Sequence, residues 1–124
     1  MNPAQNQLDQ AREMQDRTQK FALRVIHHYR ALPKHGEGRV IGNQLLRSAT
    51  GMAANYRAVC RSRSKAEFVA KMGVTLEEAD ESLFWLELIE QAEILPKRRI
   101  ASLAQEATEL VSIFSASRNT ARGK

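Results

Sequence analysis

The chain has 124 residues, a formal net charge of +5 and one cysteine. This length fits a single domain, residues 1–124, with a hydrophobic core of its own. One cysteine excludes an internal disulfide, and the sequence offers no Cys/His cluster for zinc, so we expect a reducing compartment, the cytoplasm. The polar N-terminus lacks the apolar run of a signal peptide and no segment has the apolar length of a membrane span, so we expect no membrane contact.

Charge is distributed unevenly along the chain. Residues 10–65 carry twelve Lys or Arg against three acids, whereas residues 66–95 carry one Lys against eight acids. Residues 96–124 are basic again, with six Lys or Arg against two acids. This segregation fits two interpretations: a basic surface for a polyanion, or complementary faces that pair within the molecule or between subunits.

The spacing of apolar residues predicts a first helix over about residues 4–32. Pro33 and the glycines that follow it end this helix and permit a short reversal, which favours an antiparallel neighbour. The apolar stripe of the helix has Phe21 and Ile26 at its edges. Its members are Leu8, Ala11, Ala22, Val25, Tyr29 and Leu32.

A second helix is predicted over about residues 39–62, with a wide apolar stripe that includes Tyr56 and Cys60. On this stripe Cys60 is more simply a small core residue than an activated thiolate. Gly42 and Gly51 lie inside the helix, where glycine is unfavourable, and they suggest close approach of another backbone.

The third helix begins with a capping box, in which the Ser64 hydroxyl accepts from the Glu67 amide and the Glu67 carboxylate reaches back. It is predicted over about residues 65–94 and carries two apolar faces, which need two partners. Pro96 separates it from a fourth helix over about residues 97–118, followed by a polar tail, residues 119–124. These elements predict an all-α, antiparallel, up-down-up-down four-helix bundle.

No catalytic or metal-binding pattern is present. The three histidines, His27, His28 and His35, lack the glutamate three positions earlier that di-metal bundles use, and no phosphate loop occurs. We therefore expect surface histidines, no metal, no cofactor and no enzymatic activity.

Basic residues follow one face of the second helix. The residues on this face recur at intervals of three and four: Asn43, Arg47, Thr50, Ala54, Arg57 and Arg61. Arg63 and Lys65 extend this arginine strip into the turn, and Lys97, Arg98 and Arg99 form a second basic cluster. Such a strip could contact a phosphate backbone, since each guanidinium is a forked donor. The acids of the third helix are competing partners, within the chain or across a subunit contact.

Three segments carry a resemblance to a known family: FALRVIHHYRALP, GNQLLRSATGMAANYRAVCRSRSKAEFVAKMG and LEEADESLFWLELI. They resemble the bacterial four-helix-bundle family that includes proteins encoded in intervening sequences of 23S ribosomal RNA genes. The resemblance implies a ring of five identical subunits and kinship with the accessory protein that works beside reverse transcriptase in diversity-generating retroelements. It also raises the hypothesis of RNA or DNA binding. The matching residues centre on Arg47, Ser48, Ala53, Asn55, Tyr56, Arg57 and Arg61, followed by Ser64, Glu67 and Phe68.

A ring requires two complementary faces on each subunit, because its contacts are head-to-tail. We hypothesise that Arg57 and Arg61 of one subunit meet acids such as Glu78 or Glu81 of the next. Apolar contact would come from Trp85 and Leu88. Two functions stay open: a nucleic-acid-binding oligomer, and an interaction scaffold that captures a protein partner.

Overall fold

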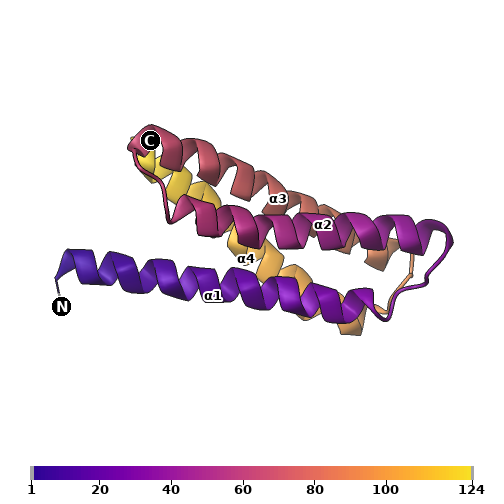
Figure 1. The fold of residues 1–124 in the computed structure, drawn as a ribbon. Coiled ribbons are helices and arrows are strands. Elements are labelled where there is room, and N and C mark those ends of the chain that lie inside the picture. The colour runs from indigo at the N-terminus through magenta and orange to yellow at the C-terminus, as the bar shows by residue number, and fades with distance from the viewer. Residues whose placement is uncertain (1, 124) are drawn as a thin grey trace.

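The computed structural model describes residues 2–123, which form four antiparallel helices (Figure 1). They are α1 (Pro3–Tyr29), α2 (Gly36–Val59), α3 (Lys65–Gln91) and α4 (Lys97–Ala121). No strand occurs among these residues, so the predicted all-α up-down-up-down bundle is confirmed. The α1–α2 and α3–α4 turns lie at one end, the two-turn end. The α2–α3 turn and both chain ends lie at the other, the one-turn end.

The predicted ends of the helices differ from the observed ones by three residues, about one turn, whereas α3 and α4 begin where predicted. At the end of α1 the amides of Ala31 and Leu32 bond the carbonyls of His28 and Tyr29, a tighter winding that turns Leu32 into the core. The second helix begins and ends three residues earlier than predicted, at Gly36 and Val59. In contrast, α4 continues to Ala121, so the first part of the predicted polar tail is helical.

The start of α3 is at Lys65, as the capping box predicts. The Ser64 hydroxyl accepts from the Glu67 amide at 3.1 Å. The Glu67 carboxylate accepts from the Lys71 ammonium at 2.8 Å and lies 3.5 Å from the Arg63 guanidinium, and the bond from Lys71 holds the Glu67 pKa below its usual value.

The end of α3 is at Gln91, three residues before the predicted one, because Glu93 adopts a left-handed backbone with φ of 56°. The amide of Glu93 bonds the Glu90 carbonyl and that of Ile94 bonds the Ile89 carbonyl, both at 3.0 Å. This pair of bonds is a Schellman motif, in which glycine is the usual left-handed residue. A glutamate there carries a conformational cost.

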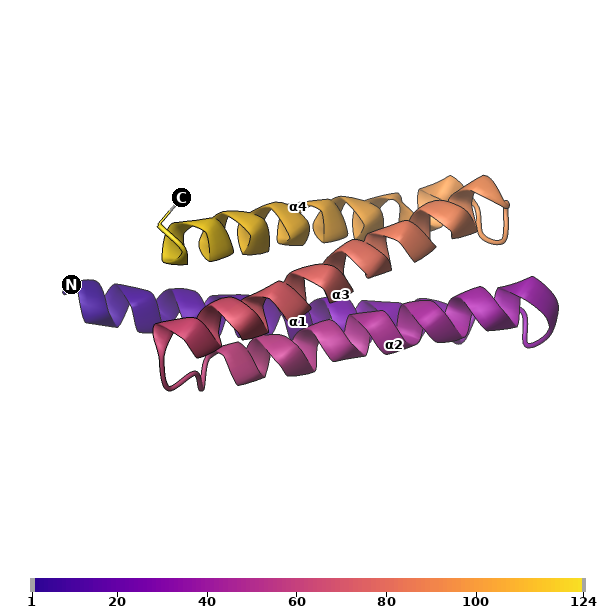
Figure 2. The same ribbon diagram turned by 90° about the horizontal axis from the view of Figure 1, so that it is seen from above.

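The core lies between all four helices, and α1 packs mainly on α2 (Figure 2). Its largest fully buried side chains include Phe21, Leu45, Met52, Leu86, Leu103 and Phe114. The α1 stripe is only partly right, since Leu8 is 53 % exposed and residues 2–10 are all exposed. Within the described residues, no helix is long and apolar enough to cross a membrane.

Gly42 and Gly51 of α2 face side chains rather than a backbone, which corrects the sequence prediction. A Cβ at Gly42 would lie 2.8 Å from Leu32 Cδ1, and one at Gly51 would lie 3.1 Å from Glu78 Oε2. Gly42 thus makes room for the turn after α1, and Gly51 makes room for a carboxylate of α3.

The interpretation of Cys60 as a core residue is wrong. Because α2 ends at Val59, Cys60 is the residue that caps the helix, and its side chain is exposed. Helical spacing predicts burial only within a helix. Beyond Val59 the chain turns away from the core, so the spacing no longer applies to Cys60.

Candidate nucleic-acid interface

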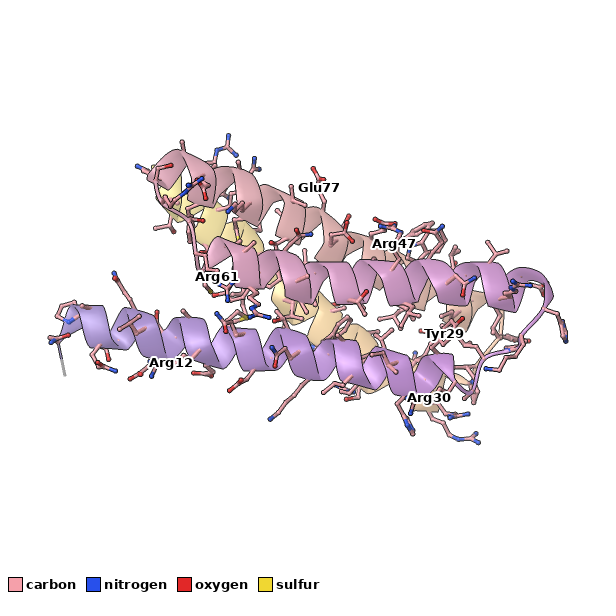
Figure 3. All side chains as sticks on the ribbon, in the orientation of Figure 1. Arg12, Tyr29, Arg30, Arg47, Arg61 and Glu77 are labelled. Carbon is pink, nitrogen blue, oxygen red and sulfur yellow. The ribbon has the colours of Figure 1, made fainter. Side chains whose placement is uncertain are left out.

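The arginine strip is exposed along its whole length, from Asn43 to Arg61, although α2 ends at Val59 and Arg61 lies in the turn that follows. Figure 3 shows Arg47 beside α3 and Arg61 close to the one-turn end. The strip is not uniform, however. Asn43 accepts a hydrogen bond from the Tyr29 hydroxyl of α1 at 2.7 Å, so its first member contacts a neighbouring helix.

Arg47 is paired within the chain. Its Nη2 donates to the Glu81 carboxylate, and its Nη1 lies 3.7 Å from Glu78 Oε2. Glu81 also accepts from the Trp85 indole at 3.3 Å. The carboxylates that we expected to meet a neighbouring subunit, Glu78 and Glu81, therefore already contact an arginine of their own chain.

Glu78 lies in the α2–α3 contact with a side chain that is only 18 % exposed. Its Oε2 is buried and accepts no hydrogen bond among the described residues. Burial raises the pKa of this carboxyl, and the Arg47 charge opposes the shift. Arg47 thus stabilises a buried charge, which is a structural role.

The C-terminal half of the strip is different. Arg57 and Arg61 are exposed, and neither forms an ion pair with any carboxylate of residues 2–123. In the turn, Arg63 is 88 % exposed and lies 3.5 Å from Glu67, while Lys65 is exposed and unpaired within the same residues. The segment from Arg57 to Lys65 therefore presents four cations to solvent at the one-turn end, one of them loosely paired.

The two-turn end carries a second basic surface. Lys97 lies 3.8 Å from Glu90, whereas Arg98 and Arg99 are exposed and form no ion pair within residues 2–123. The fold places the basic residues of the α1–α2 turn at this same end. They are Arg30, Lys34, His35 and Arg39, all exposed.

The contact between α1 and α4 adds further cations there. The Arg24 guanidinium donates to the Ser102 hydroxyl at 2.9 Å. His28, on the next turn of α1, is half-buried, and burial together with the Arg99 charge lowers its pKa. Sequence reasoning missed Arg24, Arg30 and His28 because they are far from residues 97–99 in the chain. The alternating direction of the helices could have revealed them, because it places the end of α1 and the start of α4 at the same end of the bundle (Figure 1).

The remaining signature residues of the sequence are structural. Ser48 is buried, and its hydroxyl lies 2.8 Å from that of Ser82. Tyr56 is buried and stacks on Phe114 with ring centroids 5.6 Å apart, and burial raises its pKa. Asn55 is half-buried, on the border of the strip.

An apolar cleft of about 790 Å³ opens between the four helices at the one-turn end. Met14, Tyr56, Phe68 and Met72 line it, and its rim carries Glu13 with glutamine, serine and threonine side chains. Neither in this cleft nor in the rest of residues 2–123 are three His, Cys, Asp or Glu side chains grouped closely enough to hold a metal ion.

The fold and these surfaces define a small four-helix bundle with basic residues at both ends. Residues 10–116 match the family model described as 23S rRNA-intervening sequence protein, and the chain belongs to this family. This match confirms the family resemblance of the three sequence segments described above.

A protein of unknown function from the S23 ribosomal protein family of Bacteroides thetaiotaomicron has a similar crystal structure, with a TM-score of 0.75 and 29% sequence identity. The match covers 84% of this chain and 96% of that one. No curated protein matches the chain.

Proposed function

We propose that this protein is a non-enzymatic homo-oligomer that binds RNA or DNA through the basic surfaces at the ends of its bundle. The observation that carries the proposal is that exposed arginines without a carboxylate partner in residues 2–123 are grouped at both ends of the bundle: Arg57 and Arg61 at one, Arg98 and Arg99 at the other. Arg47, by contrast, pairs within the fold.

The expected mode of binding is contact with the phosphate backbone. Guanidinium groups donate to phosphate oxygens in a forked geometry, and their binding releases counterions from the nucleic acid. Stacking of bases requires exposed aromatic rings. Tyr56 is buried, and Phe84, which is 49 % exposed, lies on the acidic helix α3. We therefore expect binding with little sequence preference.

For assembly we propose the ring of five subunits that the family resemblance implies. Since Glu78 and Glu81 contact Arg47, the α3 acids left for a subunit contact are Glu77, Asp80 and Glu87, which are exposed and unpaired within residues 2–123. They surround Phe84, and Figure 3 shows Glu77 pointing away from the bundle.

The second candidate function, a scaffold for a protein partner, is favoured by this same outer face of α3. Val74 is 45 % exposed and Phe84 49 % exposed, so apolar and acidic groups alternate there. A scaffold would use this face and leave polyanions unbound at physiological salt.

Binding of a fluorescein-labelled oligouridine, followed by anisotropy across a salt series, tests the proposal. We expect tight binding at low salt that weakens steeply as salt rises. The double variants Arg57→Gln/Arg61→Gln and Arg98→Gln/Arg99→Gln identify the end that binds. Arg12→Gln, an exposed arginine of α1, is the control for net charge. Absence of binding at low salt would overturn the proposal in favour of the scaffold.

The proposed assembly has its own measurement, the mass in solution by light scattering. Phe84→Asp should reduce the mass if the outer face of α3 is a subunit contact. Charge reversal of Arg57 and Arg61 tests their part in the same contact. An unchanged oligomer would show that these arginines are not needed for assembly.

A further inference from the structure

The contact between α1 and α4 at the two-turn end gathers cations from two helices. Arg24 and His28 lie on one face of α1, and Arg24 reaches across to Ser102 of α4 at 2.9 Å. Arg99, in the first turn of α4, is close enough to His28 to affect its titration. Figure 1 shows the start of α4 at the same end of the bundle as the end of α1. We name Arg24, His28, Arg99 and Ser102 the α1–α4 seam.

The seam contains no compensating acid. The charged groups that act on the His28 ring are Arg99 from α4 and His27 and Arg24 from α1 itself, and no charged group of α2 does so. Each of the three disfavours the protonated imidazole. Arg24 and Arg99 form no ion pair among the described residues.

Two groups at this seam also lack the hydrogen bonds that such groups usually have. The Nδ1 atom of His28 is buried and has no hydrogen-bond partner in the described residues. The N-cap of α4 is Pro96, so no side chain caps the helix, and its first turn contains no acid. Free amides at a helix start add partial positive charge beside the arginines. An anion at the seam would relieve the repulsion and accept from the free amides at the start of α4.

We propose that the α1–α4 seam is a phosphodiester-binding subsite, in which one backbone phosphate of a bound nucleic acid lies between Arg24 and Arg99 and beside His28. The Ser102 hydroxyl positions the Arg24 guanidinium. This inference deepens the proposed function and rests on it. A bound phosphate also favours the imidazolium form of His28, whose pKa is lowered in the free protein, so binding takes up a proton and strengthens as the pH falls into the range where this imidazole titrates.

The test uses the full chain and labelled oligouridine in a salt series at fixed pH. We expect Arg24→Gln and Arg99→Gln each to lower the slope of log affinity against log salt by about one, as loss of one phosphate contact does. Arg12→Gln should leave the slope close to that of the unaltered protein. Far-ultraviolet circular dichroism checks that every variant retains its helices.

Titration of the imidazole resonances by NMR gives an independent readout of the geometry. Without RNA, Arg99→Gln should raise the pKa of His28, because one opposing charge is gone. With oligouridine bound, the pKa of His28 should rise in the unaltered protein, and His28→Gln should weaken the dependence of affinity on pH.

The outcomes separate the subsite from the function. If oligouridine binds but Arg24→Gln and Arg99→Gln change neither affinity nor salt slope, the subsite is wrong and nucleic-acid binding stands. If the pKa of His28 is the same with and without bound RNA, no phosphate lies beside it and the subsite is again wrong. If oligouridine does not bind even at low salt, both proposals fail.

Discussion

The hydroxyl of Ser48 lies 2.8 Å from the hydroxyl of Ser82 at the centre of the contact between α2 and α3, and both side chains are fully buried. The Ser82 hydroxyl donates its one proton to the Glu78 carbonyl at 2.9 Å, so the Ser48 hydroxyl donates to that of Ser82, and the Leu45 carbonyl lies 3.2 Å from Ser48 Oγ. Small side chains at this crossing let the two helices approach closely. The pair satisfies both hydroxyls without a charged group in the core.

Size, more than polarity, should matter at Ser48. We expect Ser48→Leu to destabilise the protein by about 1–3 kcal/mol, since extra volume in a close-packed contact forces the helices apart. Ser48→Ala should cost about 1 kcal/mol, because Ser82 keeps its bond to the Glu78 carbonyl. Urea denaturation measures both values. Equal costs for the two variants would argue against close packing as the reason for a small residue.

Removal of Arg47 should have an effect that depends on pH. Burial raises the folded-state pKa of Glu78 above its unfolded value, so the folded state favours the protonated carboxyl. The contribution of protonated Glu78 to the free energy of unfolding is therefore lost as the pH rises through the folded-state pKa. Without Arg47 no nearby cation in residues 2–123 stabilises the charged form of the Glu78 carboxylate. We expect Arg47→Gln to cost about 1 kcal/mol at pH 7 and less at about pH 4, where Glu78 is protonated.

Stability curves by urea denaturation at the two pH values provide the measurement. Arg57→Gln is the matched control, since it removes an exposed arginine of the same helix that has no carboxylate partner in residues 2–123. Its effect should stay within about 0.5 kcal/mol at both pH values. A cost for Arg47→Gln that is the same at pH 7 and pH 4 would contradict the role assigned to Glu78.

Glycine at position 93 should stabilise the protein. Glu93 has a φ of 56° in the motif that ends α3, a conformation that glycine adopts without a Cβ clash. We expect Glu93→Gly to raise the free energy of unfolding by about 1 kcal/mol. Glu93→Ala, which retains the Cβ, should bring little gain, and thermal denaturation distinguishes the two. A gain from alanine as large as that from glycine would point to charge instead of backbone conformation.

The thiol of Cys60 should react in the folded protein. Its side chain is exposed at the end of α2, so a thiol reagent should label it without denaturant. Cys60→Ser should change the free energy of unfolding by less than about 0.5 kcal/mol. Labelling that requires unfolding would restore the interpretation of Cys60 as a core residue.

Much of the fold follows from local pattern. The helical period of apolar residues predicts four helices, and Ser64 and Glu67 predict the start of α3 to the residue. Helix ends were less accurate, because winding in the last turn depends on what the turn packs against. Leu32 and Cys60 show this, since one turns into the core and the other away from it beyond the end of a helix.

The candidate site divides in the same way. Exposure of the arginine strip of α2 follows from spacing along a helix, and membership of the family follows from the sequence of residues 10–116. Only the tertiary structure decided that Arg47 pairs with Glu78 and Glu81 while Arg57 does not pair, and that Arg24 lies against the start of α4. Periodicity determines the face on which a side chain lies. Its partner depends on which helices pack together, in which register and direction, and this is set by contacts between residues far apart in the chain.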